Sequence, residues 1–387
     1  MDYPQNIHNL TRVRFFAALW VVIFHWRASW AVDVDQYTGF FESGRLGVDI
    51  FFVLSGFVLA HVYFRRVRAG TFDYWSFLVA RLARIYPLHL AVFSFVVLQV
   101  LVAEGLKVEY DASAFPPAHI IPNLLLIQAW GFTPGATWNV PAWSISAEWF
   151  AYLLFPAFAL VGLKMVNRPW LGFLLGLVLF FAFDRIYLAM VGSPLPSATD
   201  NFGILRIVPE FLMGFMLYLL GQRFPIKSVL VRNSGLVLTI LALVLSAHWR
   251  LDERIIALLS VPLVFFLAET SRGSPQESPR FDFAEYLGQV SYSIYLLHVP
   301  FFMAAYNIME DVLGWVDGPL PTSIMLILLI IFLPVCMLSY HFVETPARGL
   351  VRTQGNRFIA YVRFAFSGAP AQKSAVPVNI EKKDIQV

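Results

Sequence analysis

The chain has 387 residues, of which 58% are hydrophobic and 14% charged, and its formal net charge is +3. An average soluble domain carries about 25% charged residues, so this composition excludes an ordinary soluble protein and indicates a membrane protein. The small net charge gives no indication of nucleic-acid binding. The single Cys336 excludes a disulfide framework or a cysteine metal cluster.

Apolar stretches of about 20 residues recur along the chain, and each is long enough to cross a bilayer as a helix. Proline, glycine and charged residues separate them. Ten spans are predicted, near residues 13–31, 46–64, 85–104, 145–163, 170–190, 203–220, 234–249, 254–269, 286–307 and 321–341. The fold class is therefore an all-α polytopic membrane protein with about ten transmembrane helices.

Residues 116–143 do not fit this pattern. The apolar run "IIPNLLLIQAW" is too short to span, and several prolines interrupt the region. We therefore interpret it as an interfacial or re-entrant segment, with a further span as the alternative.

The basic residues predict the orientation. With ten spans and the N-terminus inside, the inside segments hold 21 of the 28 Lys and Arg residues. This bias follows the positive-inside rule, so both termini are predicted to be cytoplasmic. Counting 116–143 as a span would remove the asymmetry.

The first span, "RVRFFAALWVVIFHWRASW", carries Arg14 at one end and His25 in its middle. The two are eleven residues apart, which on an ideal helix puts them within about 20° of one face and about 16 Å apart along the axis. Ionisable residues inside spans tend to be functional, and a cationic end with a deeper imidazole suits an anionic ligand. The alternative is a snorkelling arginine and a hydrogen-bonded core histidine.

Further polar residues lie in apolar surroundings. In "ARLARIYPLHL", Arg81 and Arg84 share one helical face, and two guanidinium groups there suit phosphate oxygens; a basic flank that sets the topology is the alternative. In "PAWSISAEWFAYLLFP", Glu148 must be paired or protonated, and it is a candidate to orient His25 or to accept a substrate hydroxyl. His298 in "SYSIYLLHVPFF" is interpreted as structural, and the pair Ser55 and Gly56 in "GVDIFFVLSGFVLAH" as a site of close helix packing.

Taken in order, these motifs resemble the integral-membrane acyltransferase 3 family, which O-acylates surface polysaccharides and related glycans. The resemblance covers residues 8–350 and rests on six motifs in this sequence. They are the pair Arg14 and His25, "GVDIFFVLSGFVL", Arg81 and Arg84 followed by "IYPLH", "WSISAEWFAYLLFP", "SYSIYLLHVP" and "FVETPARGL". Two departures are visible: Asn9-Leu10-Thr11 replaces the family's usual acidic-Gly lead-in, and Phe15 replaces a glycine.

The resemblance implies that His25 and Glu148 are catalytic and that Arg14, Arg81 and Arg84 bind the acyl donor. It also implies acyl-CoA, with acetyl-CoA favoured, as the donor substrate, a carbohydrate or lipid-linked glycan as the acceptor, and the bacterial inner membrane as the location. No bound cofactor or metal is expected.

The predicted organisation is a transmembrane acyltransferase domain over residues 8–350 and a disordered cytoplasmic tail over residues 364–387. Some members of the family carry an additional soluble hydrolase-like domain, which we do not expect in this chain.

The predicted reaction is transfer of the acyl group to an acceptor hydroxyl, with the neutral imidazole of His25 as general base. A covalent acyl-His or acyl-Ser intermediate is the other route. A multispan transporter or channel for a small solute or glycan is the alternative function. The absence of an inverted repeat and the clustering of the polar residues in the first four spans disfavour it.

Overall fold

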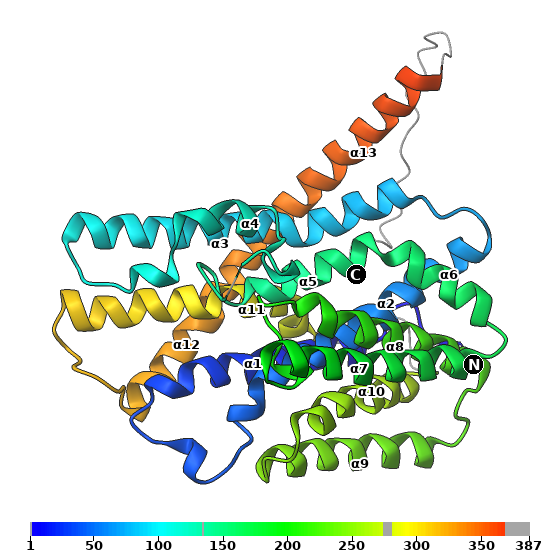
Figure 1. Ribbon diagram of the computed structural model, residues 1–387, viewed down its shortest axis with the longest axis horizontal. Coiled ribbons are helices and arrows are strands. Elements are labelled where there is room, and N and C mark those ends of the chain that lie inside the picture. The colour runs from blue at the N-terminus through cyan, green and yellow to red at the C-terminus, as the bar shows by residue number, and fades with distance from the viewer. Residues whose placement is uncertain (1, 134, 274–280, 368–387) are drawn as a thin grey trace.

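The computed structural model describes residues 2–133, 135–273 and 281–367, which fold into a bundle of helices with no β-strand in these ranges. Most helices run roughly along the long axis of the molecule (Figure 1). The long helices are α1 (His8–Trp26), α2 (Gly47–Arg68), α3 (Tyr74–Leu106), α5 (Ala142–Leu153), α6 (Phe155–Met165), α7 (Pro169–Val191), α8 (Gly203–Arg223), α9 (Val229–His248), α10 (Glu253–Thr270), α11 (Phe283–Asn307), α12 (Thr322–Ser339) and α13 (Thr345–Ser367).

Each of the ten predicted spans coincides with one of these helices, or in one case with a bent pair. Six helical segments are long and apolar enough to cross a membrane, and a seventh is the pair α5 and α6, which bends by 55°. The helices α1, α10 and α11 do not combine the length and apolarity that a membrane span needs, and all three carry polar or charged side chains. The prediction of an all-α polytopic membrane protein is therefore confirmed, whereas the number of ten spans and the orientation stay predictions.

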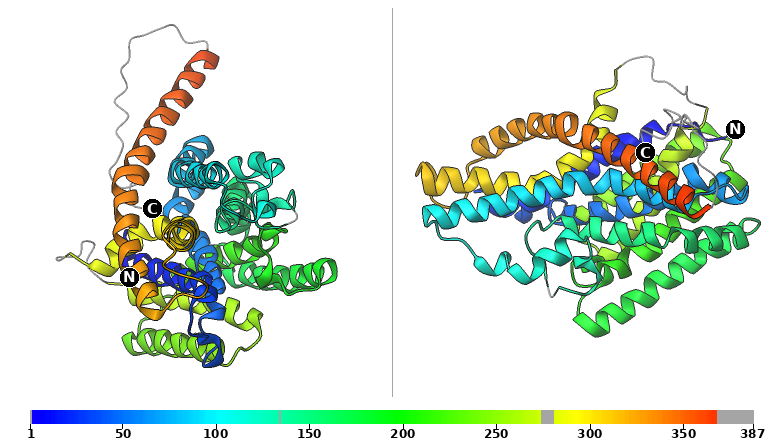
Figure 2. Two further views of the ribbon diagram at one scale, coloured as in Figure 1. Left: turned by 90° about the vertical axis from the view of Figure 1, so that its left-hand side faces the viewer. Right: turned by 90° about the horizontal axis from the view of Figure 1, so that it is seen from above.

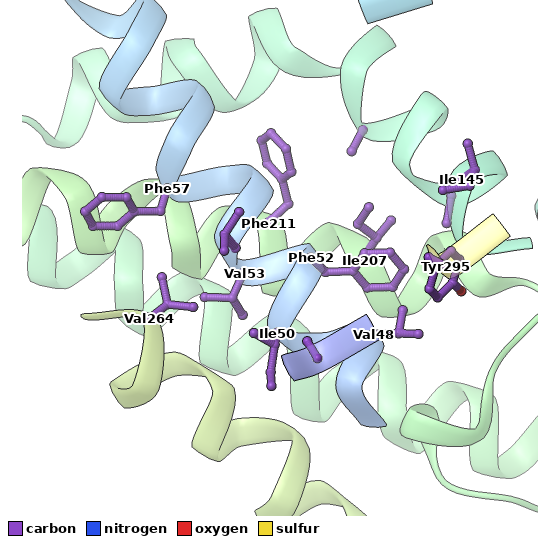
Figure 3. Close-up of a cluster of buried hydrophobic side chains, with 14 of the residues drawn as sticks. Val48, Ile50, Phe52, Val53, Phe57, Ile145, Ile207, Phe211, Val264 and Tyr295 are labelled. Carbon is purple, nitrogen blue, oxygen red and sulfur yellow. The ribbon is translucent and has the colours of Figure 1, made fainter. Parts of the chain in front are cut away.

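The centre of the bundle is the contact between α2 and α8. Gly56 of α2 lies against the backbone carbonyl of Phe211, and Gly214 of α8 lies against that of Val53. A Cβ at either glycine would overlap the facing oxygen, so only glycine permits this approach. The close packing predicted at Ser55 and Gly56 is confirmed at Gly56, whereas the Ser55 hydroxyl bonds to Glu148. Figure 3 shows the buried side chains around this contact, with Phe57 of α2 among them.

The segment 116–143 contains no spanning helix, as predicted. Within it, short turns at Pro117–His119 and Gln128–Trp130 flank the brief helix α4 (Ile120–Leu124). Two hydrogen bonds join the segment to the middle of α3: His89 Nε2 donates to the carbonyl of Asn123 at 2.8 Å, and the Tyr86 hydroxyl to that of Leu124 at 2.7 Å. The segment therefore folds back beside α3.

The C-terminal region differs from the prediction. Helix α13 continues to Ser367, so residues 364–367 are helical, whereas disorder was predicted from residue 364; residues 368–387 lie outside the described ranges. The helix packs on α3, where Arg363 forms an ion pair with Asp73 at 2.7 Å, and its far end projects from the bundle (Figures 1 and 2). Local composition predicted disorder from residue 364, whereas the helix, with this tertiary contact near its end, continues to residue 367.

Candidate active site

A pocket inside the bundle brings together four of the five predicted site residues. It has a volume of about 90 Å³, well above the roughly 10–15 Å³ that one water needs, so it can hold several waters or a small acyl group. Helices α1, α2, α3, α5 and α11 surround it. Its lining is Arg14, Phe51, Phe52, Leu54, Ser55, Val58, Leu59, Arg81, Arg84, Ile85, Ser144, Ile145, Glu148, Tyr152, Ser291, Tyr292 and Tyr295.

The pocket is cationic because three guanidinium groups border it. Arg14 comes from α1, whereas Arg81 and Arg84 are one turn apart on α3 and face the pocket together, as their spacing predicted. Glu148 is the carboxylate in the lining. The lining therefore carries more positive than negative charge, which suits an anionic ligand.

Aromatic rings hold Arg81 in place. Its side chain is 4% exposed, and its guanidinium carbon lies 5.8 Å from the ring centres of both Tyr63 and Tyr152 and 6.0 Å from that of Phe77. The guanidinium also donates a long hydrogen bond of 3.5 Å to the Tyr63 hydroxyl. Lysine is not equivalent at such a site, because its ammonium group lacks the planar fork of a guanidinium.

Arg84 is engaged with a carboxylate that the sequence analysis did not single out. It forms an ion pair with Glu344, which is 1% exposed and also pairs with Arg348 at 2.9 Å. The hydroxyl of Ser293 donates to the second oxygen of Glu344 at 2.9 Å. Glu344 belongs to "FVETPARGL", so this motif, quoted for the family resemblance, contributes the partner of Arg84. Arg84 therefore has both a structural partner and a place in the pocket wall.

Glu148 is held by two hydroxyl groups. The Ser55 hydroxyl of α2 donates to its Oε1 at 2.5 Å, and the Tyr152 hydroxyl, one turn further along α5, donates to the same oxygen at 2.6 Å. Both bonds require an acceptor oxygen and fix the carboxyl group at the pocket wall. His25 contacts Val21 and His298, so among the described residues no hydrogen bond joins Glu148 to His25 as an orienting role would require.

His25 contacts His298 of α11 instead. The two rings are 4.8 Å apart, with His25 Nδ1 3.1 Å from His298 Nε2. His298 Nδ1 lies 2.5 Å from the Tyr295 carbonyl, and His25 Nδ1 lies 3.0 Å from the Val21 carbonyl. Carbonyls only accept, so both Nδ1 atoms carry hydrogen, and the single Nδ1–H of His25 is shared between the Val21 carbonyl and His298 Nε2.

This pattern leaves the lone pair of the neutral His25 ring on Nε2. Within the described residues, that nitrogen has no hydrogen-bond partner. A neutral imidazole with its Nδ1 proton engaged and its Nε2 lone pair available is the form that a general base or a nucleophile requires.

Tyr295 separates the histidine pair from the cationic pocket. Its side chain lines the pocket, its ring centre lies 5.9 Å from that of His298, and its hydroxyl accepts a hydrogen bond from Ser144 at 2.7 Å. His25 itself is not part of the pocket lining. The site therefore has two parts, a cationic pocket and a histidine pair, with Tyr295 between them.

His298 was interpreted as structural, and its contact with His25 was not predicted, because a lone histidine in a span gives no indication of its neighbours. It also did not single out Glu344 or Tyr295. The motifs "SYSIYLLHVP" and "FVETPARGL", which contain these residues, were the only sequence features that could have indicated them.

The described helices and this pocket define a polytopic helical membrane protein with a cationic cavity beside a histidine pair. The chain belongs to the acyltransferase 3 family: the family model, described as an acyltransferase domain, matches residues 7–341. The resemblance found in the sequence is thereby confirmed over nearly the predicted range.

Two curated relatives illustrate the similarity. The chain is 34% identical over 177 residues to the acyltransferase MdmB of Streptomyces mycarofaciens. These residues are 43% of this chain and 42% of the relative. It is 27% identical over 387 residues to the peptidoglycan O-acetyltransferase OatA of Listeria monocytogenes, covering 93% of this chain and 57% of that protein. The chain thus spans about half the length of these relatives. The comparison with solved structures gave no match.

Proposed function

We propose that this protein is a membrane-bound O-acyltransferase that moves an acetyl group from acetyl-CoA to a hydroxyl of a cell-surface or exported glycan, in the inner membrane of a bacterium. Its membership of the acyltransferase 3 family supports the reaction class. The similarity to a relative named as a peptidoglycan O-acetyltransferase favours acetyl as the acyl group and a glycan as the acceptor.

The observation that carries this proposal is the pairing of a cationic pocket with a histidine whose Nε2 is available. The phosphates of coenzyme A are polyanionic, and Arg14 and Arg81 are the groups proposed to bind them. Arg14 and Val58 also border a second cavity of about 40 Å³, which reaches the N-terminal residues Gln5 and Asn6. The donor would approach along this cavity from the predicted cytoplasmic side, with its thioester directed toward Tyr295.

In the proposed reaction, His25 Nε2 removes the proton of the acceptor hydroxyl as that oxygen attacks the thioester carbonyl carbon. The new carbon–oxygen bond forms, the carbon–sulfur bond breaks, and the departing thiolate takes the proton from the imidazolium. A covalent route would use the same Nε2 as the nucleophile. His298 holds the Nδ1 proton of His25 in either case.

The reaction is tested by measuring free thiol released from acetyl-CoA by purified protein in the presence of a glycan acceptor. His25→Ala should abolish release, because general-base catalysis contributes about 10²–10⁴-fold. His248→Ala is the matched control, since His248 lies at the end of α9, where it contacts Thr38, and it should be fully active. A well-folded His25→Ala protein with normal turnover would refute the catalytic assignment. Absence of any thiol release from the unmodified protein would favour the transporter alternative.

The donor site is tested with Arg81. Arg81→Ala should raise the Michaelis constant for acetyl-CoA, and Arg81→Lys should restore it poorly, because an ammonium group lacks the planar fork with which a guanidinium binds phosphate oxygens. Unchanged kinetics in Arg81→Ala would remove Arg81 from the donor site.

The proposed role of Glu148 is to contribute a carboxylate charge at the pocket wall. Glu148→Gln keeps an oxygen that can accept from Ser55 and Tyr152 but removes the charge. We expect it to lower turnover strongly, whereas Ser55→Ala, which removes one of two hydrogen-bond donors and keeps the charge, should lower it less. Near-normal turnover in Glu148→Gln would make the carboxyl group structural.

A further inference from the structure

A second and larger cavity lies apart from the candidate active site. Its volume is about 520 Å³, and it is formed by the C-terminal ends of α2 and α8 and by the turn between α6 and α7. These ends lie at the same end of the bundle (Figure 1). The cavity shares no lining residue with the catalytic pocket, and its size is in the range of about 300–1,000 Å³ typical of small-molecule sites.

Three arginines give this cavity its charge. Arg65 and Arg68 come from the last turns of α2, and Arg223 ends α8. Among the described residues, no carboxylate forms an ion pair with any of the three. The amides of Asn167 and Gln222 add further hydrogen-bond donors to the lining. The cavity therefore presents uncompensated positive charge and suits an anionic ligand.

The walls of the cavity are in part apolar. Phe64 and Leu219 line it. The flanking helices α6 and α7 carry exposed apolar side chains. Leu160 and Trp170 on their surfaces are 57% and 51% exposed. An exposed tryptophan beside basic residues is typical of the membrane interface. An anion with attached hydrocarbon would use both the arginines and these surfaces.

We propose that this cavity binds the phosphate headgroup of an anionic phospholipid of the inner leaflet. The phosphate pairs with Arg65, Arg68 and Arg223, and the acyl chains lie along α6 and α7. Basic cavities between helices on the cytoplasmic side are suited to such headgroups. The predicted orientation puts this cavity on the cytoplasmic side. A phosphate ligand could also be inorganic phosphate or the nucleotide part of coenzyme A, but neither would use the apolar surfaces.

Cations at helix C-termini also stabilise the helix dipole, and basic residues on this side set the topology. Neither role requires a ligand. The experiment must therefore compare these arginines with other cations on the same side of the protein.

The test is native mass spectrometry of the full chain in detergent, titrated separately with phosphatidylglycerol, phosphatidylcholine of the same chain length, inorganic phosphate and coenzyme A. The cavity variant is Arg65→Gln with Arg223→Gln. The control is Lys227→Gln with Arg357→Gln, which removes the same charge from two exposed residues outside the cavity. Because the exchanged side chains are exposed, both proteins should fold; Arg65→Gln alone serves if the double variant expresses poorly.

We expect the unmodified protein to bind one phosphatidylglycerol in preference to phosphatidylcholine. Each basic residue near an anionic lipid contributes about 1 kcal/mol, so the cavity variant should bind phosphatidylglycerol about 30-fold more weakly and the control about as tightly as the unmodified protein. Equal losses in both variants, or equal binding of the two lipids, would overturn the proposal. Loss of coenzyme A or inorganic phosphate binding with unchanged phosphatidylglycerol binding would overturn the lipid as the source of the phosphate.

Discussion

The contact between His25 and His298 predicts how an enzyme altered at His298 should behave. In His298→Leu the ring that accepts the Nδ1 proton of His25 is removed, while the Val21 carbonyl, 3.0 Å from the same nitrogen, remains. The lost hydrogen bond is 3.1 Å long, within the normal range, and such bonds contribute about 0.5–1.5 kcal/mol net. Turnover should therefore fall by roughly 2- to 13-fold.

This loss is far smaller than the about 10²–10⁴-fold expected for removing the base itself. His298→Gln is the informative companion, because its amide oxygen can accept from His25 near the position of the lost Nε2. It should retain more turnover than His298→Leu. Since neither change touches the arginines, the Michaelis constant for acetyl-CoA should stay the same in both.

The assay is steady-state thiol release per folded molecule, with folded yield measured by gel filtration in detergent. A His298→Leu protein that folds well and is as inactive as His25→Ala would refute a positioning role and assign chemistry to His298 itself. Equal turnover in His298→Leu and the unmodified enzyme would show that the contact does not orient His25.

Three further predictions concern folding. Arg84→Ala should lower folded yield, because the about 3–5 kcal/mol cost of removing one partner of a buried ion pair is offset only in part by Arg348, the second partner of Glu344, and adding Glu344→Gln should restore part of the yield by removing the incompletely compensated charge. Gly56→Ala should prevent stable packing of α2 on α8, whereas Gly105→Ala, at a site with open space, should leave the melting temperature unchanged. Asp282→Ala should destabilise the protein at neutral pH by about 1 kcal/mol through loss of a helix cap.

The pH dependence of the last variant can be given a sign. The backbone N–H groups at the start of α11, and then a neighbouring arginine, hold the pKa of Asp282 below its usual value. A group with a lowered pKa in the folded state stabilises above its unfolded pKa and loses that contribution as the pH falls through the folded pKa. The stability difference between Asp282→Ala and the unmodified protein, measured by thermal unfolding, should therefore shrink below about pH 4. A difference that grew on acidification would contradict this account.

Two outcomes would contradict the first two of these folding predictions. If Glu344→Gln fails to improve the folded yield of Arg84→Ala, the loss comes from the packing of the arginine and not from its charge. If Gly105→Ala destabilises as much as Gly56→Ala, close packing is not the reason for the glycine in α2.

The sequence by itself determined the positions of the helices, because hydropathy and helix length are local properties. Each predicted span coincides with a helix, and the prolines of 116–143 correctly indicated a segment that does not cross. Local spacing also placed Arg81 and Arg84 together on the pocket side of α3. The family resemblance came from short motifs that can be read one at a time.

The tertiary structure decided which distant residues meet. His298 lies 273 positions after His25, and Glu344 lies 260 positions after Arg84, so no local pattern could connect either pair. Distance along the chain also hid the bond between Ser55 and Glu148. It likewise hid the contact of Arg363 with Asp73, which lies next to the helical residues 364–367. Helix formation depends on neighbours along the chain, whereas the chemistry of the site depends on how α1, α3, α5 and α11 pack.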